Sequence, residues 1–180
     1  LALIYDAAHA MGVTVNGRPI SDWGDLSMFS FHATKLYHAI EGGALVFRDA
    51  ARKKTFDYLK NFGFESETEV VMPGTNAKMN ELQALMGELI LTRLSELIER
   101  RRAITARYRE RLAQVPGLRL PPLPAGGVVW NHAYMPVEVL PACCSRRNLR
   151  AGFLAVFRFV IYDPTFFQFH RIRNSHGCYS

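Results

Sequence analysis

The sequence of 180 residues predicts an α/β protein with a mixed sheet. Residues 1–5 and 26–31 are short apolar runs with the length of buried strands. A third run, residues 44–47, follows after a brief connection that allows antiparallel pairing. Residues 82–112 repeat leucine and other apolar residues at helical spacing. Short strands combined with a long amphipathic helix favour the α/β class.

The first two predicted strands each end close to a residue that can take part in chemistry. Asp6 lies at the carboxyl end of the first run, and open α/β sheets bind ligands at the carboxyl ends of their strands. The second run ends near Ser30 and is followed by Lys35 in a loop. We therefore expect one carboxylate and one amine at the same edge of the sheet.

This pair of groups suits pyridoxal phosphate (PLP). A lysine amine forms a Schiff base with the cofactor aldehyde, and a carboxylate keeps the pyridine nitrogen protonated. Ser30 is placed to donate a hydrogen bond to the phosphate. From spacing alone, a solvated surface lysine and a turn-forming aspartate are the more common interpretation.

Turns and one short helix follow from the glycines and polar residues. Residues 16–19 predict an exposed turn, and the glycine pair 42–43 permits a tight return of the chain. Asp49 is predicted to cap a helix that runs to Lys60, with Gly63 just beyond its end. The sequence has no G-x-G-x-x-G or Walker-type loop, which speaks against a dinucleotide or nucleoside-triphosphate site.

Residues 82–112 are predicted to form one helix that begins at a capping box of Asn80 and Gln83. Its apolar stripe is typical of a core-facing surface. Its polar side interleaves arginines with glutamates, which is typical of a solvated face with ion pairs between neighbouring turns. A helix that binds nucleic acid through its arginines is the alternative.

After this helix, residues 116–117 (Pro-Gly) provide a stop, and the proline-rich residues 120–124 predict a stiff extended stretch. Residues 128–139 predict a strand of a small domain. Residues 141–180 differ in composition, because they hold six arginines, no lysine and all three cysteines. This change predicts a shifted reading frame or a very divergent end, and we assign no function to it.

The net charge of +6 does not indicate a nucleic-acid partner, because it is concentrated at one end. Residues 1–140 carry 16 Lys and Arg against 15 Asp and Glu, whereas residues 141–180 carry six Arg against one acid. No apolar run reaches the ~20 residues of a membrane span, so we expect a cytoplasmic protein without a membrane partner. The cysteines have no zinc-site spacing, and we expect no metal.

An ordered series of short motifs resembles one known family. The series is Asp6-Ala7-Ala8-His9, Gly24-Asp25, Phe29-Ser30-Phe31, Lys35, Glu41-Gly42-Gly43 and Gly74-x-Asn76-x-Lys78-Met79-Asn80-Glu81-Leu82-Gln83-Ala84. It resembles the DegT/DnrJ/EryC1/StrS family of sugar aminotransferases, over residues 1 to about 139. The phrase SFHATK followed by EGGA is similar to the branch that aminates nucleotide-linked 4-keto-6-deoxy sugars.

The resemblance implies a fold-type-I PLP-dependent transferase with a three-layer, mostly parallel mixed sheet. Residues 1–115 would be the C-terminal half of the PLP-binding large domain with its long connecting helix, and residues 116–180 part of a small α+β domain. The implied cofactor is PLP and the implied catalytic residue is Lys35. The resemblance also implies cofactor contacts from four further residues: Asp6, His9, Ser30 and Asn76.

The implied reaction transfers an amino group from glutamate to a nucleotide-linked keto-deoxy sugar of the dTDP-4-keto-6-deoxyglucose type. Such sugars serve cell-surface polysaccharide or natural-product biosynthesis. The family also implies a homodimer, in which Asn76 reaches the cofactor phosphate of the other subunit. Lys78 stands where the family often has arginine, so it keeps the charge without the bidentate fork.

Three alternatives remain. The chain begins at Leu1 with a strand under way, so we expect it to start inside a longer protein and to lack a phosphate-binding turn and an aromatic residue from the first half. An inactive fragment is therefore the first alternative. A dehydratase of the same family is the second, although that branch has histidine in place of Lys35. A basic nucleic-acid-binding module is the third.

Overall fold

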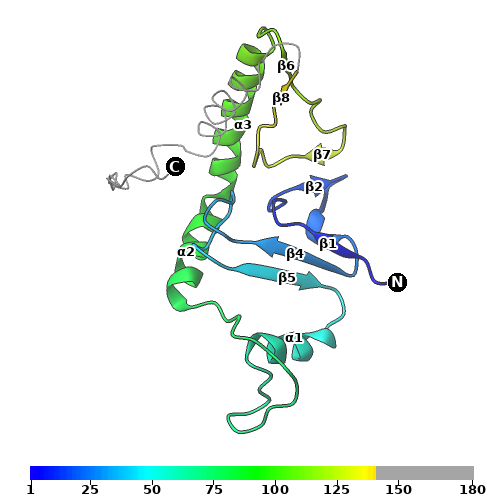
Figure 1. Cartoon of the computed structure of the whole chain (residues 1–180), viewed down its shortest axis with the longest axis vertical. Helices are drawn as coiled ribbons and strands as arrows, with labels where there is room; N and C mark the ends of the chain where they lie inside the picture. Colours follow the sequence, from blue (N-terminus) through cyan, green and yellow to red (C-terminus); the bar gives the residue numbers. More distant parts are fainter. Residues whose placement is uncertain (141–180) are drawn as a thin grey trace, which may run out of the picture.

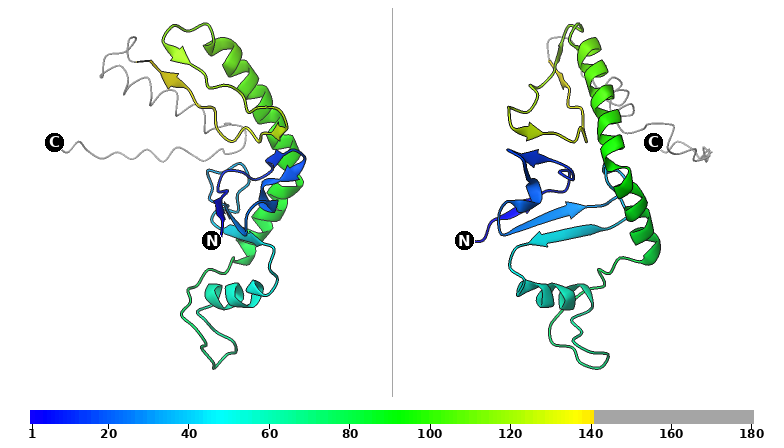
Figure 2. Two further views of the ribbon diagram at one scale, coloured as in Figure 1. Left: turned by 90° about the vertical axis from the view of Figure 1, so that its right-hand side faces the viewer. Right: turned by 180° about the vertical axis from the view of Figure 1, so that it is seen from behind.

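The computed structural model describes residues 1–140, so the expectation for residues 141–180 lies outside the described residues. The two longest helices, α2 (Glu81–Thr92) and α3 (Leu94–Leu112), follow one another along one side of the molecule (Figure 1). The strands stand on the other side of this helical column, as the reverse view in Figure 2 also shows. The mixture of parallel and antiparallel strands with helices confirms the predicted α/β class.

The central sheet has the order β1–β4–β5 and carries the predicted mixed pairing. Strand β1 (Ile4–Asp6) pairs in parallel with β4 (Leu26–Ser30), with Asp6 opposite Met28. Strand β5 (Gly43–Phe47) returns antiparallel to β4, with Ser30 opposite Gly43. Two parallel carboxyl ends therefore meet at one edge, as the sequence predicts.

The buried core lies between this sheet and the first helix of the column. Its buried members come from the turn after β1, from β4, from the loop after β4 and from α2: Ala7, Phe29, Phe31, Tyr37, Ala39 and Ile90. The rings of Phe31 and Tyr37 meet edge-on, with their centroids 4.7 Å apart. This contact anchors the loop after β4, which contains Lys35, to the core.

Two smaller sheets complete the described strands. Strands β2 (Thr14–Val15) and β3 (Arg18–Pro19) form a hairpin, and the φ of 51° at Asn16 and 76° at Gly17 are those of the tight turn that joins them, within the predicted exposed turn of residues 16–19. A short 3₁₀ helix, η1 (Ile20–Asp22), follows. The prediction of one strand over residues 128–139 was wrong, because this segment holds two short strands in different sheets. Strand β7 (Val128–Val129) pairs with β2, whereas β8 (Glu138–Val139) pairs with β6 (Leu118–Arg119).

The short helix α1 (Arg52–Lys60) begins later than the sequence predicts. Asp49 accepts a hydrogen bond from the backbone N–H of Ala51 at 3.0 Å, so it stabilises the turn before the helix instead of capping its first turn. Phe56 contacts Phe47 of β5, with their ring centroids 4.8 Å apart. Gly63, with a φ of 81°, lies just beyond the helix end, as expected.

The predicted single helix is two helices, with a break at Arg93. The φ of −108° and ψ of 3° at Arg93 end α2, and α3 starts at the next residue. The predicted capping box is confirmed, because Asn80 and Gln83 exchange hydrogen bonds of 2.9 and 3.1 Å. Apolar spacing continues across the break, so the pattern does not reveal it.

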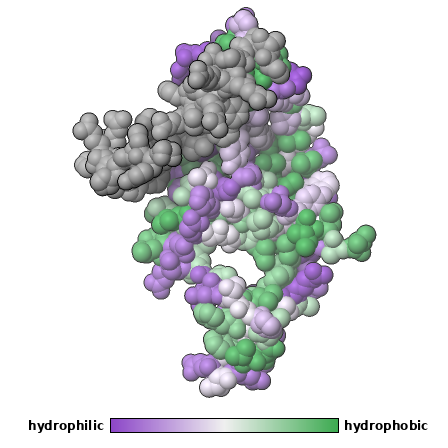
Figure 3. All heavy atoms as spheres, in the orientation of Figure 1, coloured by the Kyte–Doolittle hydropathy of each residue, from purple (hydrophilic) through white to green (hydrophobic). Residues whose placement is uncertain are grey.

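The apolar stripe is only partly buried among the described residues. Ile90 is buried, but Leu82, Leu85 and Leu89 are 74%, 52% and 55% exposed, so the prediction of a core-facing stripe was wrong for this side of α2. Figure 3 shows apolar residues reaching the surface over a wide area of one face. Apolar surface gathered on one helix face is typical of an interaction surface.

Several arginines of α3 are engaged within the chain. Arg100 pairs with Glu96 at 2.9 Å and Arg102 with Glu99 at 2.6 Å, as predicted for a solvated face. Arg109 donates to the carbonyl oxygen of Pro121 at 2.9 Å. Within residues 1–140, no helix has the length and apolar content that a membrane crossing requires.

Candidate active site

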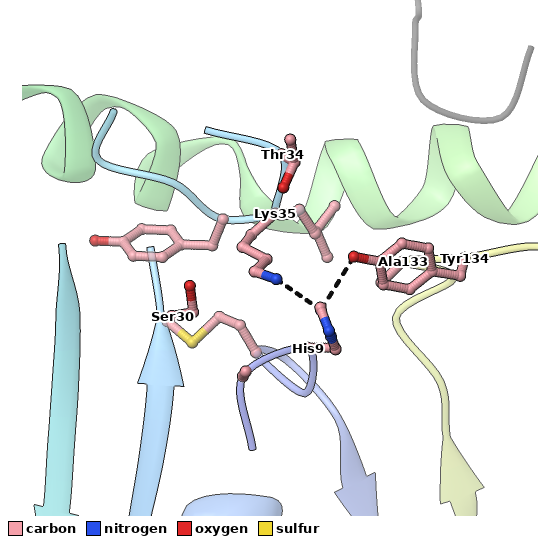
Figure 4. Close-up of a pocket in the computed structure, with 10 residues that line it drawn as sticks. His9, Ser30, Thr34, Lys35, Ala133 and Tyr134 are labelled. Carbon is pink, nitrogen blue, oxygen red and sulfur yellow. Dashed lines mark hydrogen bonds between the residues drawn. The ribbon is translucent and has the colours of Figure 1, made fainter. Parts of the chain in front are cut away.

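A pocket lies at the edge of the sheet where β1 and β4 end (Figure 4). It is lined by residues of the turn after β1, the end of β4, the loop that follows and a segment near residue 134: Ala8, His9, Met11, Ser30, Thr34, Lys35, Leu36, Tyr37, Ala133 and Tyr134. Ser30 is the last residue of β4, and its partly buried hydroxyl faces this hollow. Strand ends and loops of three chain regions therefore build one site.

The loop that carries Lys35 is closed by backbone hydrogen bonds. The N–H of Phe31 donates to Gly42 at 2.8 Å, and the N–H of Ala39 donates to the carbonyl of Phe31 at 2.9 Å. Tyr37 is buried, and burial raises the pKa of its hydroxyl. A Cβ added to Gly87 of α2 would lie 2.8 Å from the Tyr37 oxygen, so this glycine leaves the room that Tyr37 occupies.

Three polar side chains converge in the pocket. The Nζ atom of Lys35 lies 3.2 Å from Nδ1 of His9, and the hydroxyl of Tyr134 lies 3.1 Å from the same nitrogen (Figure 4). The His9 and Tyr134 rings meet edge-on, with centroids 4.8 Å apart. Lys35 is half-buried, whereas His9 is exposed.

The segment that brings Tyr134 to the pocket is held by buried hydrogen bonds. Asn131 is 1% exposed, and its side-chain amide donates to the backbone carbonyls of His9 and Met11, each at 2.8 Å. Its side-chain oxygen accepts from the N–H of Ala133 at 3.0 Å. Arg101 of α3 donates to the carbonyl of Ala133 at 3.1 Å. The residues before Tyr134 are therefore tied to both the His9 turn and α3.

The structure brings some of the predicted site residues together and leaves others apart. Lys35, His9 and Ser30 share the pocket. Asp6 ends β1 at the same edge, but it is exposed, does not line this pocket, and accepts the N–H of Ala8 at 3.1 Å. Asn76 and Lys78 lie elsewhere: Asn76 pairs through its backbone with Asn61, and the Lys78 amine donates to the Asn61 side chain at 2.8 Å.

Sequence reasoning missed two pocket hydroxyls and the residue that positions one of them. Thr34 directly precedes Lys35 and lines the pocket. The sequence pattern places Tyr134 in a strand and indicates no role for Asn131. The polar Asn131 in an otherwise apolar and aromatic run, WNHAYM, is the signal that could have indicated a buried hydrogen-bonding group.

Two histidines near the site are shifted toward their neutral form. Burial lowers the pKa of His38, and the nearby guanidinium of Arg101 adds to that effect. Burial also lowers the pKa of His132, with a smaller contribution from Arg102 in the same direction. Both effects favour the uncharged imidazole of these two histidines.

The comparison with protein families decides the identity of the chain. The model of the DegT/DnrJ/EryC1/StrS aminotransferase family matches residues 1–157. The chain belongs to this family. Its members are PLP-dependent aminotransferases, so the resemblance seen in the sequence is confirmed.

Curated relatives agree with this family. The chain is 39% identical over 139 residues to the dTDP-4-amino-4,6-dideoxy-D-glucose transaminase of Shigella dysenteriae, which covers 77% of the chain and 38% of that protein. It is 30% identical over 176 residues to the dTDP-4-dehydro-2,3,6-trideoxy-D-glucose 4-aminotransferase of Saccharopolyspora spinosa, which covers 88% of the chain and 46% of that protein. The chain thus spans less than half the length of these relatives.

Solved structures give the same fold. The aminotransferase TlmJ from Streptoalloteichus hindustanus matches with a TM-score of 0.79 and 30% identity, over 87% of this chain and 43% of that one. DesI, solved in the presence of its TDP-sugar product, matches with a TM-score of 0.76 and 42% identity, over 86% and 40%. The described chain therefore has part of the α/β fold of these fold-type-I PLP enzymes.

The pocket residues fit the reactive groups of PLP. Lys35 supplies an amine, and Ser30 and Thr34 supply hydroxyls of the kind that bind phosphate. His9 provides an aromatic ring beside the amine.

Proposed function

We propose that this protein serves in the PLP-dependent transamination of a nucleotide-linked keto-deoxy sugar, with glutamate as the amino donor. The observation that carries the proposal is the position of the Lys35 amine, in a pocket at the carboxyl edge of β1 and β4 that also holds His9 and Ser30. The names of the relatives support a dTDP-linked sugar of the 4-keto-6-deoxyglucose type.

PLP, when bound, supplies an aldehyde carbon and a ring that withdraws electrons from the carbon that loses its proton. In the proposal, Lys35 holds the cofactor and then carries the proton between the donor carbon and the cofactor. Its place in a closed loop, tied to the core through Tyr37, holds the backbone from which the amine reaches the pocket. His9 lies beside the amine and orients it.

Asp6 is proposed to keep the cofactor ring nitrogen protonated. Its place at the end of β1, beside the strand that ends at Ser30, supports this role, since a carboxylate at that edge stabilises a nearby positive charge. Ser30 is proposed to donate to the phosphate.

Asn76 and Lys78 are proposed to act on the site of a second subunit, because both are exposed and lie away from the Lys35 pocket. The exposed leucines of α2 support a homodimer surface. Leu85→Glu is expected to weaken self-association in sedimentation experiments, and Leu123→Glu, at another exposed leucine, to leave it unchanged. Equal self-association of both variants would reject α2 as the dimer surface.

A cytoplasmic location is part of the same proposal, which fractionation of the producing cells would test.

Borohydride trapping tests the cofactor site. The chain is incubated with PLP, reduced, digested, and searched by mass spectrometry for cofactor attached to the peptide that contains Lys35. We expect the label to concentrate on Lys35 and to disappear in Lys35→Ala. Lys60→Ala is the matched control, because Lys60 is an exposed lysine outside the pocket.

A label spread over surface lysines, or none, would show that this chain has no working cofactor site. The same experiment on the protein as its gene encodes it then separates an inactive fragment from a wrong assignment. Amino transfer from glutamate to dTDP-4-keto-6-deoxyglucose, followed by chromatography of the aminated sugar, tests the substrate. Transfer to other keto sugars only would overturn the substrate while leaving the cofactor site intact.

A further inference from the structure

The contact between Tyr134 and His9 raises a question that the proposed function does not answer. Tyr134 and Lys35 both approach Nδ1 of His9, at 3.1 and 3.2 Å. A neutral imidazole nitrogen offers a single position for a hydrogen bond, as a donor or as an acceptor. Tyr134 and Lys35 therefore share one site on His9, and only one of them can use it fully at any moment.

The chemistry of the two partners decides how they share it. A protonated Lys35 amine can only donate, so Nδ1 must accept, and the hydrogen of a neutral His9 then lies on Nε2. When the amine turns away from His9, the Tyr134 hydroxyl can donate to the vacated position. The His9 ring then keeps the same hydrogen-bonding pattern in both situations.

We propose that Tyr134 is a positioning residue, which takes over Nδ1 of His9 when Lys35 leaves it and so holds the ring and its tautomer fixed. This inference rests on the proposed function, in which Lys35 changes partners during each cycle. The backbone supports it, because Asn131 ties the Tyr134 segment directly to the carbonyl of His9 itself. The hydroxyl and the ring therefore keep their separation without Lys35.

The test measures the tautomer of His9 and needs no cofactor. Long-range ¹⁵N–¹H NMR spectra distinguish a ring hydrogen on Nε2 from one on Nδ1, and are recorded at about pH 8, where an ordinary imidazole is neutral. The protein is compared with Lys35→Met, Tyr134→Phe and the double variant. Tyr134→Phe keeps the ring of a side chain that is 37% exposed and removes only the hydroxyl, so the fold should persist.

We expect the hydrogen on Nε2 in the unchanged protein and in both single variants, because one partner for Nδ1 always remains. In the double variant both partners are gone, and the two ring-nitrogen resonances should move toward each other as the tautomers mix. Lys35→Met combined with Tyr37→Phe is the matched control, since the Tyr37 oxygen lies against α2. It should behave like Lys35→Met alone.

Two results would overturn the inference. One is a Lys35→Met protein that already shows the mixed tautomers of the double variant, since Tyr134 would then not replace the amine. The other is a hydrogen on Nδ1 in the unchanged protein. Because no PLP is present, these outcomes are independent of the trapping experiment. A protein that fails to bind cofactor can still show the exchange of partners, and a protein that binds cofactor can fail to show it.

Discussion

Replacement of Asn131 by alanine should destabilise the protein strongly. The side chain is 1% exposed and makes three hydrogen bonds, to the carbonyls of His9 and Met11 and from the N–H of Ala133. Each such bond contributes about 0.5–1.5 kcal/mol net, and groups left buried without a partner cost more. We expect Asn131→Ala to lower the free energy of unfolding by about 2–4 kcal/mol. For a chain of this size that corresponds to a fall of about 5–15 °C in the melting temperature.

Urea unfolding followed by circular dichroism measures this change. Asn76→Ala is the matched control, because Asn76 is exposed and the substitution should stay within about 0.5 kcal/mol. Asn131→Asp keeps the acceptor for Ala133 but points an oxygen at two carbonyl oxygens, so it should cost at least as much as alanine. An Asn131→Ala protein as stable as the control would refute the argument that these bonds hold the segment.

Two further predictions concern packing and pH. Gly87→Leu should lower both the melting temperature and the cofactor label on Lys35, because an added Cβ would lie 2.8 Å from the Tyr37 oxygen. Gly126→Leu, whose added Cβ would have no atom within 4 Å, should leave both unchanged. Equal effects of the two variants in thermal melts and in trapping would contradict this prediction. Burial lowers the pKa of His38, so the unfolded chain binds more protons and stability should fall as the pH drops below about 6.5. His38→Gln should weaken this dependence of the free energy of unfolding on pH, which urea titrations at several pH values measure. An unchanged pH dependence would exclude His38 as its cause.

The sequence predicts the sheet edge and three of the pocket residues for a physical reason. Parallel strands end at the same edge, so residues directly after two short apolar runs are brought together without further information. This accounts for Lys35 and Ser30 in one pocket, whereas the prediction for His9 rests on the family resemblance. Asp6 reaches the edge for the same reason, but the direction of its side chain depends on the local turn, where it accepts the N–H of Ala8.

Other features depend on contacts that no local pattern encodes. Tyr134 reaches His9 across 125 positions of sequence, and buried hydrogen bonds of Asn131 hold the segment just before Tyr134. The helix break at Arg93 leaves the apolar spacing intact, so periodicity does not detect it. The leucine stripe of α2 shows which face is apolar, but periodicity does not tell what covers it.

The two roles given to the 131–134 segment make a joint prediction. If Asn131 positions Tyr134, then its loss should free the hydroxyl from His9 even in molecules that remain folded. In a Lys35→Met background, Asn131→Ala should therefore produce the same mixed tautomers of His9 as Tyr134→Phe does. Spectra are recorded well below the melting temperature, so that global unfolding does not contribute. A single Nε2 tautomer in that double variant would show that Asn131 stabilises the fold without positioning Tyr134, and the approach of Tyr134 to His9 would then have to come from α3 through the bond of Arg101 to Ala133.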